Sequence, residues 1–334
     1  MATLRYTAVF LRFQAPLHLG ELGVGAEGVQ SRLAHAETLW AALVVAWVRL
    51  FGTPEPLAPP DPETLDTWHP PFLLSSAFPF VGQTLYFPRP RVRLQGPRVA
   101  GTPLAKPLKK LQFVAQPFFE QWIRQEPFTM EHLEKMIQDS ERLQHRIRPY
   151  QEPHVFLGHA AFRSQIYYVG ATSFSSEAGL FFLVDFSHTP PEIQERFSAA
   201  LNLLAEEGLG GRRSYGMGRF TWHTQALPLQ VPDPPHGFLL LSGLNPDPDF
   251  LKAAPLHRSS YTLYRSHGWA LSPLTKDQAF RRPLWMFGEG SVFPVQPTGR
   301  LVEVTPHDWS APHPLYRHGL AFAVPCRLPE VPHA

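Results

Sequence analysis

The fold of this chain is decided by the stretch Thr189-Pro-Pro-Glu-Ile-Gln-Glu-Arg-Phe-Ser-Ala-Ala-Leu-Asn-Leu-Leu-Ala-Glu-Glu-Gly-Leu-Gly-Gly-Arg-Arg-Ser-Tyr-Gly-Met-Gly-Arg-Phe220. Thr189 and Glu192 have the spacing of a capping box, and the two prolines between them suit the first turn of a helix. Gly208 is typical of a helix end. The apolar face of this helix would consist of Ile193, Phe197, Leu201 and Leu204. The sequence therefore predicts a helix from Thr189 that stops at Gly208.

The glycine-rich loop, residues 208–220, follows this helix and leads into an alternating strand at Arg219–His223. Five of its first eleven residues are glycines, which would let backbone N–H groups approach phosphates closely. Arg212, Arg213 and Arg219 supply charge, and Tyr215 supplies a face on which a base can stack. The loop is neither a Walker motif nor a dinucleotide fingerprint, because no Gly-Lys-Ser/Thr follows and its helix precedes the glycines. It predicts an RNA cradle, and a flexible connection with solvated arginines is the alternative.

Residues that precede the quoted stretch supply the other elements of a ferredoxin-like domain. Leu4–Phe13 alternates as a strand does, and Ala36–Phe51 predicts a helix that is apolar on nearly every face and closed by Gly52. Two further strands, Ile166–Phe174 and Leu180–Phe186, flank a short turn and predict a hairpin. The order strand, helix, two strands, helix, strand is that of the ferredoxin-like fold. We therefore expect an α+β protein.

The rest of the chain predicts an insertion and a second domain. We place the first domain at residues 1–227, with an insertion at about 53–160 that holds helical stretches at Leu108–Trp122 and Met130–Arg146. Prolines from Pro228 to Pro235 are typical of a linker. Residues 236–334 form the second domain, which we expect to be strand-rich and also ferredoxin-like. Its strands are expected near Phe238–Leu241, Tyr261–Tyr264, Leu301–Val304 and Leu320–Val324.

Composition excludes several classes of protein. With 334 residues at about 150 per domain the chain is long enough for two domains, and its 44% hydrophobic content excludes disorder. The single cysteine, Cys326, excludes a disulfide framework, and its apolar setting predicts an inert core thiol. The apolar run Leu39–Val48 is too short for a membrane span and predicts a buried helix, with a partner-facing helix as the alternative. We expect a cytoplasmic protein without membrane contact, cofactor or metal.

Basic residues are unevenly distributed, although the net charge is only +2. A window without acidic residues, between Asp66 and Glu120, contains Arg89, Arg91, Arg93, Arg98, Lys106, Lys109 and Lys110. A second such window, from Arg212 to Pro232, contains the arginines of the glycine-rich loop. Arginine suits bidentate phosphate contacts, so the pattern predicts a polyanionic partner, with genome composition or a hot habitat as the alternative. The alternation Arg89-Pro-Arg-Val-Arg93 would place three guanidinium groups on one face, toward RNA or an acidic protein patch.

The glycine-rich loop resembles that of the RAMP superfamily of CRISPR RNA-binding proteins, where it follows the second helix of a ferredoxin-like domain. Four other segments narrow the resemblance to the family of the fourth Csm subunit of type III-A CRISPR effector complexes. They are Pro16-Leu-His-Leu-Gly20 with Ala36-Glu-Thr-Leu39, Lys106-Pro-Leu-Lys-Lys-Leu-Gln-Phe-Val114, Gly288-Glu-Gly-Ser-Val-Phe293 and His313-Pro-Leu-Tyr-Arg-His-Gly-Leu-Ala-Phe322. Two positions depart from the family pattern: Ala36-Glu37 replaces Ser-Asp, and His318 replaces Tyr.

The resemblance implies a non-catalytic subunit that caps the foot of the complex and holds the repeat-derived 5′ tag of the crRNA. It also implies docking to the large signature subunit and to a backbone RAMP subunit. The residues expected to bind RNA are Gly210, Gly211, Arg212, Arg213, Ser214, Tyr215, Gly216, Gly218, Arg219, Lys109, Lys110 and Arg163.

Two other functions stay open at this point. Related RAMP proteins mature crRNA without a metal, using histidine as general base for attack by a 2′-hydroxyl, and His18 or His35 lies in the right region for that role. The chain would then be a metal-independent crRNA-processing endoribonuclease. In the other alternative the basic segments contact only protein, and the chain is a scaffold.

Overall fold

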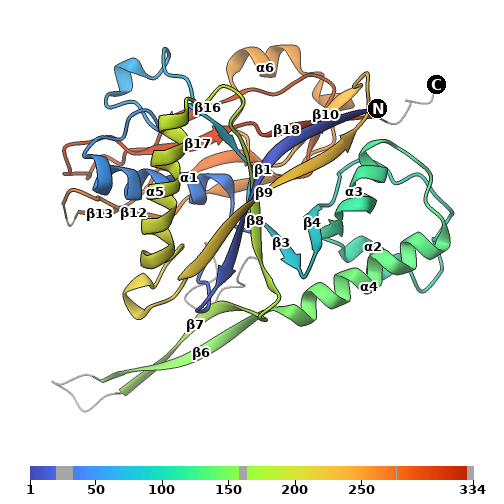
Figure 1. Cartoon of the computed structure of the whole chain (residues 1–334), viewed down its shortest axis with the longest axis horizontal. Helices are drawn as coiled ribbons and strands as arrows, with labels where there is room; N and C mark the ends of the chain where they lie inside the picture. Colours follow the sequence, from blue (N-terminus) through green and yellow to red (C-terminus); the bar gives the residue numbers. More distant parts are fainter. Residues whose placement is uncertain (20–32, 158–163, 276, 329–334) are drawn as a thin grey trace.

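The computed structural model describes residues 1–19, 33–157, 164–275 and 277–328 (Figure 1). A seven-stranded antiparallel sheet lies at its centre in the order β5-β4-β3-β8-β1-β9, and β2 also pairs with β8. The strands of this sheet are β1 (Ala2–Phe13), β2 (Leu73–Leu74), β3 (Phe78–Val81), β4 (Thr84–Pro88), β5 (Phe113–Ala115), β8 (Ala178–Asp185) and β9 (Phe220–Val231).

The long central strands are buried on both faces, because successive side chains of a strand point to opposite sides of the sheet. Ala8 and Phe10 of β1 pack in one core, whereas Val9 and Leu11 pack in the other. Two helices, α1 (Ala36–Phe51) and α5 (Pro191–Glu207), cover the face of Val9 and Leu11. The first strand, both helices and the core position of the apolar run in α1 were predicted from the sequence, and the structure confirms them.

The start of α5 differs from the prediction. Thr189 does not cap the helix; its hydroxyl donates a hydrogen bond to the carbonyl of Pro71 at 2.6 Å, and Pro190 takes the N-cap position. A capping box does occur at α4 (Met130–Arg146), where the Thr129 hydroxyl accepts from the backbone of His132 at 3.2 Å. The Thr-x-x-Glu pattern therefore failed because a tertiary partner competed for the hydroxyl of Thr189.

The range predicted as an insertion, about 53–160, holds the helices α2 (Ala105–Lys110), α3 (Gln116–Ile123) and α4. It also holds β6 (Ile147–Leu157) and four strands of the central sheet, β2 to β5. The predicted helical stretch Leu108–Trp122 is wrong in its middle, because Phe113, Val114 and Ala115 extend the sheet by pairing with β4. Their side chains are buried in the core, and this tertiary packing overrides the local preference for a helix. The helix predicted at Met130–Arg146 is confirmed.

The predicted hairpin is also wrong. The strand β7 (Ser164–Phe174) pairs with β6 (Ile147–Leu157), and the two extend away from the body of the molecule (Figure 1). β8 instead joins the central sheet between β1 and β3. β6 was not predicted because it contains two prolines and two charged residues, and proline in a run argues against a strand. The strand beside β8 is β3, from within the range predicted as insertion.

The C-terminal region is strand-rich, as predicted, and continuous with the first part. Its elements are β10 (Gly237–Leu240), α6 (Pro248–Ala253), β11 (Leu263–Ser266), β12 (Trp269–Leu271), β13 (Gln278–Phe280), β14 (Leu284–Phe287), β15 (Val292–Phe293), β16 (Gly299–Glu303), β17 (Tyr316–Leu320) and β18 (Ala323–Cys326). β10 lies between β15 and β18, and the other strands form separate pairs.

The two predicted domains share one hydrophobic core. Leu229 of β9 and Val324 of β18 belong to the same buried cluster, and the rings of Tyr6 and Phe322 lie 4.9 Å apart. β9 continues to Val231, through the start of the predicted linker. Cys326 is buried in this core, and burial raises the pKa of its thiol. Within the described residues, no helix is long and apolar enough to cross a membrane.

Candidate nucleic-acid interface

The glycine-rich loop is a closed structure that rests on the segment after β1. The backbone N–H of Gly211 donates to the carbonyl of His18, and that of Gly218 donates to the carbonyl of Pro16, each at 2.9 Å. Leu209 also donates to the carbonyl of Gly218 at 2.9 Å, which brings the two ends of the loop together. These bonds fix the backbone, so the exposed part of the loop is held in one place.

Two glycines of the loop serve different purposes. Gly218 has φ +77°, and a Cβ placed there would lie 2.0 Å from the carbonyl oxygen of Leu209. Gly216 has the same φ, but a Cβ there would meet nothing within 4 Å. Gly218 therefore allows the loop to close on itself, whereas Gly216 provides a left-handed turn in open space.

The three loop arginines have different electrostatic surroundings. Arg213 lies 3.4 Å from Glu207, and Arg219 lies 2.8 Å from Glu206, so carboxylates at the end of α5 partly neutralise both. Arg212 has no carboxylate partner within the part of the chain that the structure describes. Its guanidinium instead lies 5.6 Å from the ring centre of Tyr215 and 5.7 Å from that of Tyr167.

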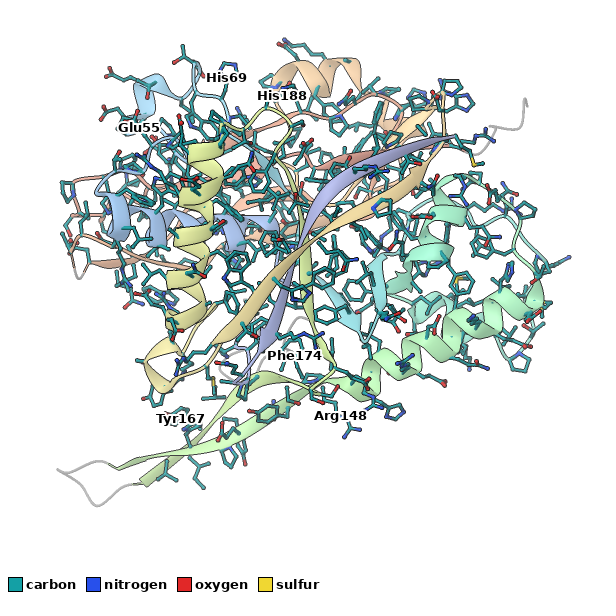
Figure 2. The ribbon with its side chains drawn as sticks, viewed as in Figure 1. Glu55, His69, Arg148, Tyr167, Phe174 and His188 are labelled. Carbon is teal, nitrogen blue, oxygen red and sulfur yellow. The ribbon has the colours of Figure 1, made fainter. Side chains whose placement is uncertain are left out.

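An aromatic platform therefore surrounds Arg212. Tyr167 comes from β7 at the hairpin (Figure 2), and Tyr215 comes from the glycine-rich loop with its side chain 66% exposed. His154 of β6 stacks on Tyr167 with ring centres 5.4 Å apart. Tyr215 is exposed and Tyr167 is half-buried, and aromatic rings beside an arginine without a carboxylate partner are typical of surfaces that bind single-stranded nucleic acid.

A cavity of about 2290 Å³ joins the loop to the insertion and to the C-terminal region. Of the residues predicted to bind RNA, it is lined by Gly210, Gly211, Arg212, Arg213, Ser214, Lys109 and Lys110. Tyr215, Gly216, Gly218 and Arg219 are not among its lining residues, and Arg163 lies outside the described residues. The structure thus brings together two segments that are about a hundred positions apart in the sequence.

The Arg89–Arg93 segment is divided between different environments. Arg89 and Arg91 line the cavity, and Arg93 is not among the lining residues, so the three do not share one face of it. The Arg89 guanidinium donates to the carbonyls of Leu108 and Lys109 at 3.1 Å, and burial lowers its pKa. Arg89 thereby holds the last turn of α2, where Lys109 and Lys110 lie.

Another part of the cavity is lined by His35, which the sequence offered as a candidate general base, and by Tyr264 and Glu289. His35 Nδ1 lies 2.8 Å from a carboxylate oxygen of Glu289, and the same oxygen accepts a hydrogen bond from Ser76. The His35 ring stacks on Tyr264 with centres 4.5 Å apart. Burial works to raise the pKa of Glu289, but the charge of His35 and the two hydrogen bonds lower it below its usual range.

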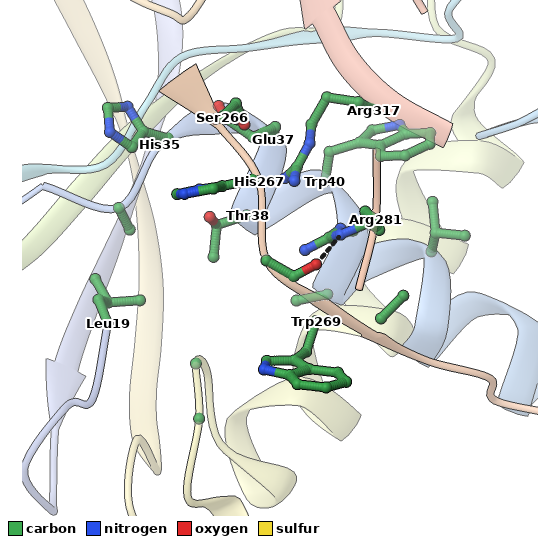
Figure 3. A pocket seen from close by; sticks show the side chains of 18 of the residues that line it. Leu19, His35, Glu37, Thr38, Trp40, Ser266, His267, Trp269, Arg281 and Arg317 are labelled. Carbon is green, nitrogen blue, oxygen red and sulfur yellow. Dashed lines mark hydrogen bonds between the residues drawn. The ribbon is translucent and has the colours of Figure 1, made fainter. Parts of the chain in front are cut away.

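Arg281 and Arg317 lie near Glu37, around the helix α1 (Figure 3). Burial, and the charge of Arg317, lower the pKa of Arg281 to about 9. Glu37 is 3% exposed and accepts hydrogen bonds from Tyr264 and Ser266, each at 3.0 Å. The sequence analysis noted the motifs that contain Glu289 and Arg317. The burial of these two side chains and the contacts that they make depend on the fold.

Sequence comparisons place the C-terminal region in a known family. Residues 235–326 match the family model of the CRISPR Csm4 C-terminal domain. A protein of Streptococcus thermophilus, "CRISPR system Cms protein Csm4", is 29% identical over 215 residues, which are 63% of this chain and 63% of that protein. A protein of the same name from Thermococcus onnurineus (strain NA1) is 26% identical over 272 residues, or 77% of this chain and 81% of that one.

Solved structures share the fold over nearly the whole chain. A chain in a Csm1–Csm4 cassette with cA4 is 19% identical with a TM-score of 0.61, and the match covers 98% of this chain and 100% of that one. A chain of a Csm3–Csm4 subcomplex from a type III-A interference complex is 18% identical with a TM-score of 0.59, over 96% and 99% of the two chains. A type III-B Cmr-beta complex contains a chain with a TM-score of 0.51, 14% identity and coverage of 86% and 85%.

The fold is therefore that of subunits of type III CRISPR effector complexes. Within this class, the chain is similar to Csm4 proteins, and its residues 235–326 match the C-terminal domain of that family.

Proposed function

We propose that this chain is the crRNA-binding subunit of a type III-A complex and that it caps the 5′ tag of the crRNA. The observation that carries the proposal is the cavity that joins the glycine-rich loop to Lys109 and Lys110. Among the described residues, ten Lys and Arg residues line it against three Glu residues. Such an excess of positive charge favours a polyanion over a neutral or acidic ligand.

We also propose that the first domain has a ferredoxin-like fold. Its support is the strand order β3-β8-β1-β9, in which α1 follows β1 and α5 connects β8 to β9 on one face of the sheet. The C-terminal region has the partial order β15-β10-β18, with α6 after β10. We propose that residues 236–334 form a second ferredoxin-like module with fewer helices than the first.

The proposed partners are the large signature subunit and a backbone RAMP subunit. The support is that chains with this fold occur in a Csm1–Csm4 cassette and in a Csm3–Csm4 subcomplex. Exposed apolar side chains in the C-terminal region, among them Trp285 at 64% and Leu263 at 52%, offer a contact surface. Co-expression should give a stable sub-complex with the large subunit. If the two proteins elute separately at micromolar concentration and moderate salt, direct docking is wrong.

We further propose that the chain acts in the cytoplasm and does not cleave RNA. The test is to incubate the purified protein with repeat RNA and to score both retention and cleavage. Binding without cleavage is the expected result. Cleavage that disappears in His18→Ala or His35→Ala would overturn the proposal, and failure to bind RNA would favour a scaffold.

One observation favours the endoribonuclease as a second candidate. His35 lines the cavity, and its contact with Glu289 orients the ring as a carboxylate orients a general base. Glu289→Gln should then lower the cleavage rate without changing RNA affinity, because the carboxylate would act through His35. His18 has a different contact: its Nδ1 lies 2.6 Å from the backbone carbonyl oxygen of Gly170. A carbonyl group is not a carboxylate, so among the described residues His18 lacks the partner that His35 has in Glu289.

A further inference from the structure

Two arginines in the cavity, the buried Arg317 and the half-buried Arg281, lack adequate partners among the described residues. Arg317 of β17 is 3% exposed, and its Nε and Nη2 atoms have no hydrogen-bond partner among the described residues. The side chain of Arg281, which follows β13, donates a long hydrogen bond of 3.4 Å from Nε to the carbonyl of Gly268 and no other to the part of the chain that the structure describes. Both side chains line the cavity, and Figure 3 shows them on the same side of α1 as Glu37.

The charges at this position do not balance. Glu37 is the carboxylate that influences both guanidinium groups, yet it forms no ion pair with either among the described residues. Its Oε1 accepts hydrogen bonds from Tyr264 and Ser266, and its buried Oε2 has no hydrogen-bond partner there. Glu289, the other buried carboxylate of the cavity, is paired with His35. Two guanidinium groups, one buried and one half-buried, therefore face one carboxylate. An uncompensated buried charge is costly unless a counter-ion or ligand neutralises it.

We propose that Arg281 and Arg317 form a binding site for a phosphate group. The unpartnered N–H groups of Arg317 supply fixed donors, and a guanidinium matches the geometry of phosphate oxygens in a bidentate manner. Trp269, 62% exposed, lines the same cavity and offers a face on which a base could stack. The phosphate belongs either to an RNA strand that continues from the glycine-rich loop or to a free phosphate; the RNA source rests on the proposed function.

The first test measures thermal unfolding of the full chain in sodium phosphate and in sodium chloride at equal ionic strength. Arg317→Met keeps the side-chain volume and removes the charge, and Arg281→Met is a second variant. Arg282→Met is the matched control, because Arg282 is the next residue, is about half exposed and bonds the carbonyl of Glu303 at 3.1 Å.

Phosphate should raise the midpoint of the wild type and of Arg282→Met, and the response should fall at least severalfold in the other two variants. In chloride, Arg317→Met should unfold at the same temperature as the wild type or higher, because it removes an unpaired buried charge. A lower midpoint in chloride would mean that the guanidinium already has a partner within the chain. That result, or an undiminished phosphate response in Arg317→Met, overturns the proposal.

The second test distinguishes the two sources with a labelled single-stranded RNA that carries the 5′ tag. A loss of RNA affinity of about tenfold or more in Arg317→Met, but not in Arg282→Met, assigns the site to a phosphate of the strand. Unchanged RNA affinity with a lost phosphate response assigns it to free phosphate. Unchanged behaviour in both assays overturns it. Failure of the wild type to bind RNA at all would contradict the proposed function while leaving the phosphate readout intact.

Discussion

At the scale of single residues, Gly218 and Gly216 share one backbone conformation and differ in what surrounds them. We predict that Gly216→Ala lowers the free energy of unfolding by about 1 kcal/mol, which is the cost of a left-handed residue with a Cβ. Gly218→Ala adds a collision with the Leu209 carbonyl and should cost about 3 kcal/mol or more. Denaturant unfolding of the two variants measures the difference. Equal losses would mean that the loop does not close as described.

His318 provides a pH-dependent test. It is 2% exposed, and burial lowers its pKa to about 3, whereas the unfolded chain has a histidine pKa of about 6.5. Between these values the unfolded state binds a proton that the folded state refuses, so stability falls as pH falls. His318→Gln should lessen this loss by about 1 kcal/mol per pH unit from pH 6.5 toward 3. Urea unfolding at several pH values measures it, with exposed His257→Gln as the control. A variant as acid-sensitive as the wild type would contradict the prediction.

Sequence reasoning identified the loop arginines as a set but not their separate roles. The carboxylates Glu206 and Glu207, which contact Arg219 and Arg213, belong to the helix that precedes the loop. Whether such neighbours pair depends on how the loop turns back, and that is set by contacts with residues near His18. Arg317 was visible within a motif, but its burial results from the way β16 and β17 lie against α1.

At the scale of elements, two threonines that precede helices give opposite expectations. Thr129→Ala removes the cap of α4 and should cost about 1 kcal/mol of stability. Thr189→Ser should cost little if the hydroxyl still reaches the carbonyl of Pro71, while Thr189→Ala should lose that tertiary bond. Helix α5 itself should begin at the same residue in both Thr189 variants, as amide hydrogen exchange would show. Fraying of α5 in Thr189→Ala would mean that Thr189 does cap the helix, as the sequence predicted.

The sequence predicted the helices α1, α4 and α5. α1 was predicted from a long apolar run that ends at Gly52, and α5 from its apolar face and from Gly208. Sequence reasoning failed for β6 and for the partner of β8, since strand pairing depends on segments far apart in the chain. A short apolar segment such as Phe78–Val81 fits several positions in a sheet. Only the complete packing decides between them.

At the scale of the whole molecule, the shared core predicts that the two parts unfold together. Leu229 and Val324 belong to one buried cluster, so removal of residues 236–334 would expose apolar side chains of β1 and β9. We predict one cooperative thermal transition for the full chain and loss of stable folding for residues 1–235. Calorimetry of the full chain measures the first, and circular dichroism of the truncated chain measures the second. Two separate transitions would show independent domains.

We propose that the glycine-rich loop holds RNA through its arginines, and affinity for tag RNA across a salt series measures this directly. Arg212→Ala combined with Arg213→Ala should reduce the log–log slope by about 0.7 to 1.4, because each lost phosphate contact removes about 0.7. Arg258→Ala, an exposed arginine that does not line the cavity, is the control and should leave the slope unchanged. If the double variant stays folded and keeps both its affinity and its slope, the loop is a structural connection and the account is contradicted.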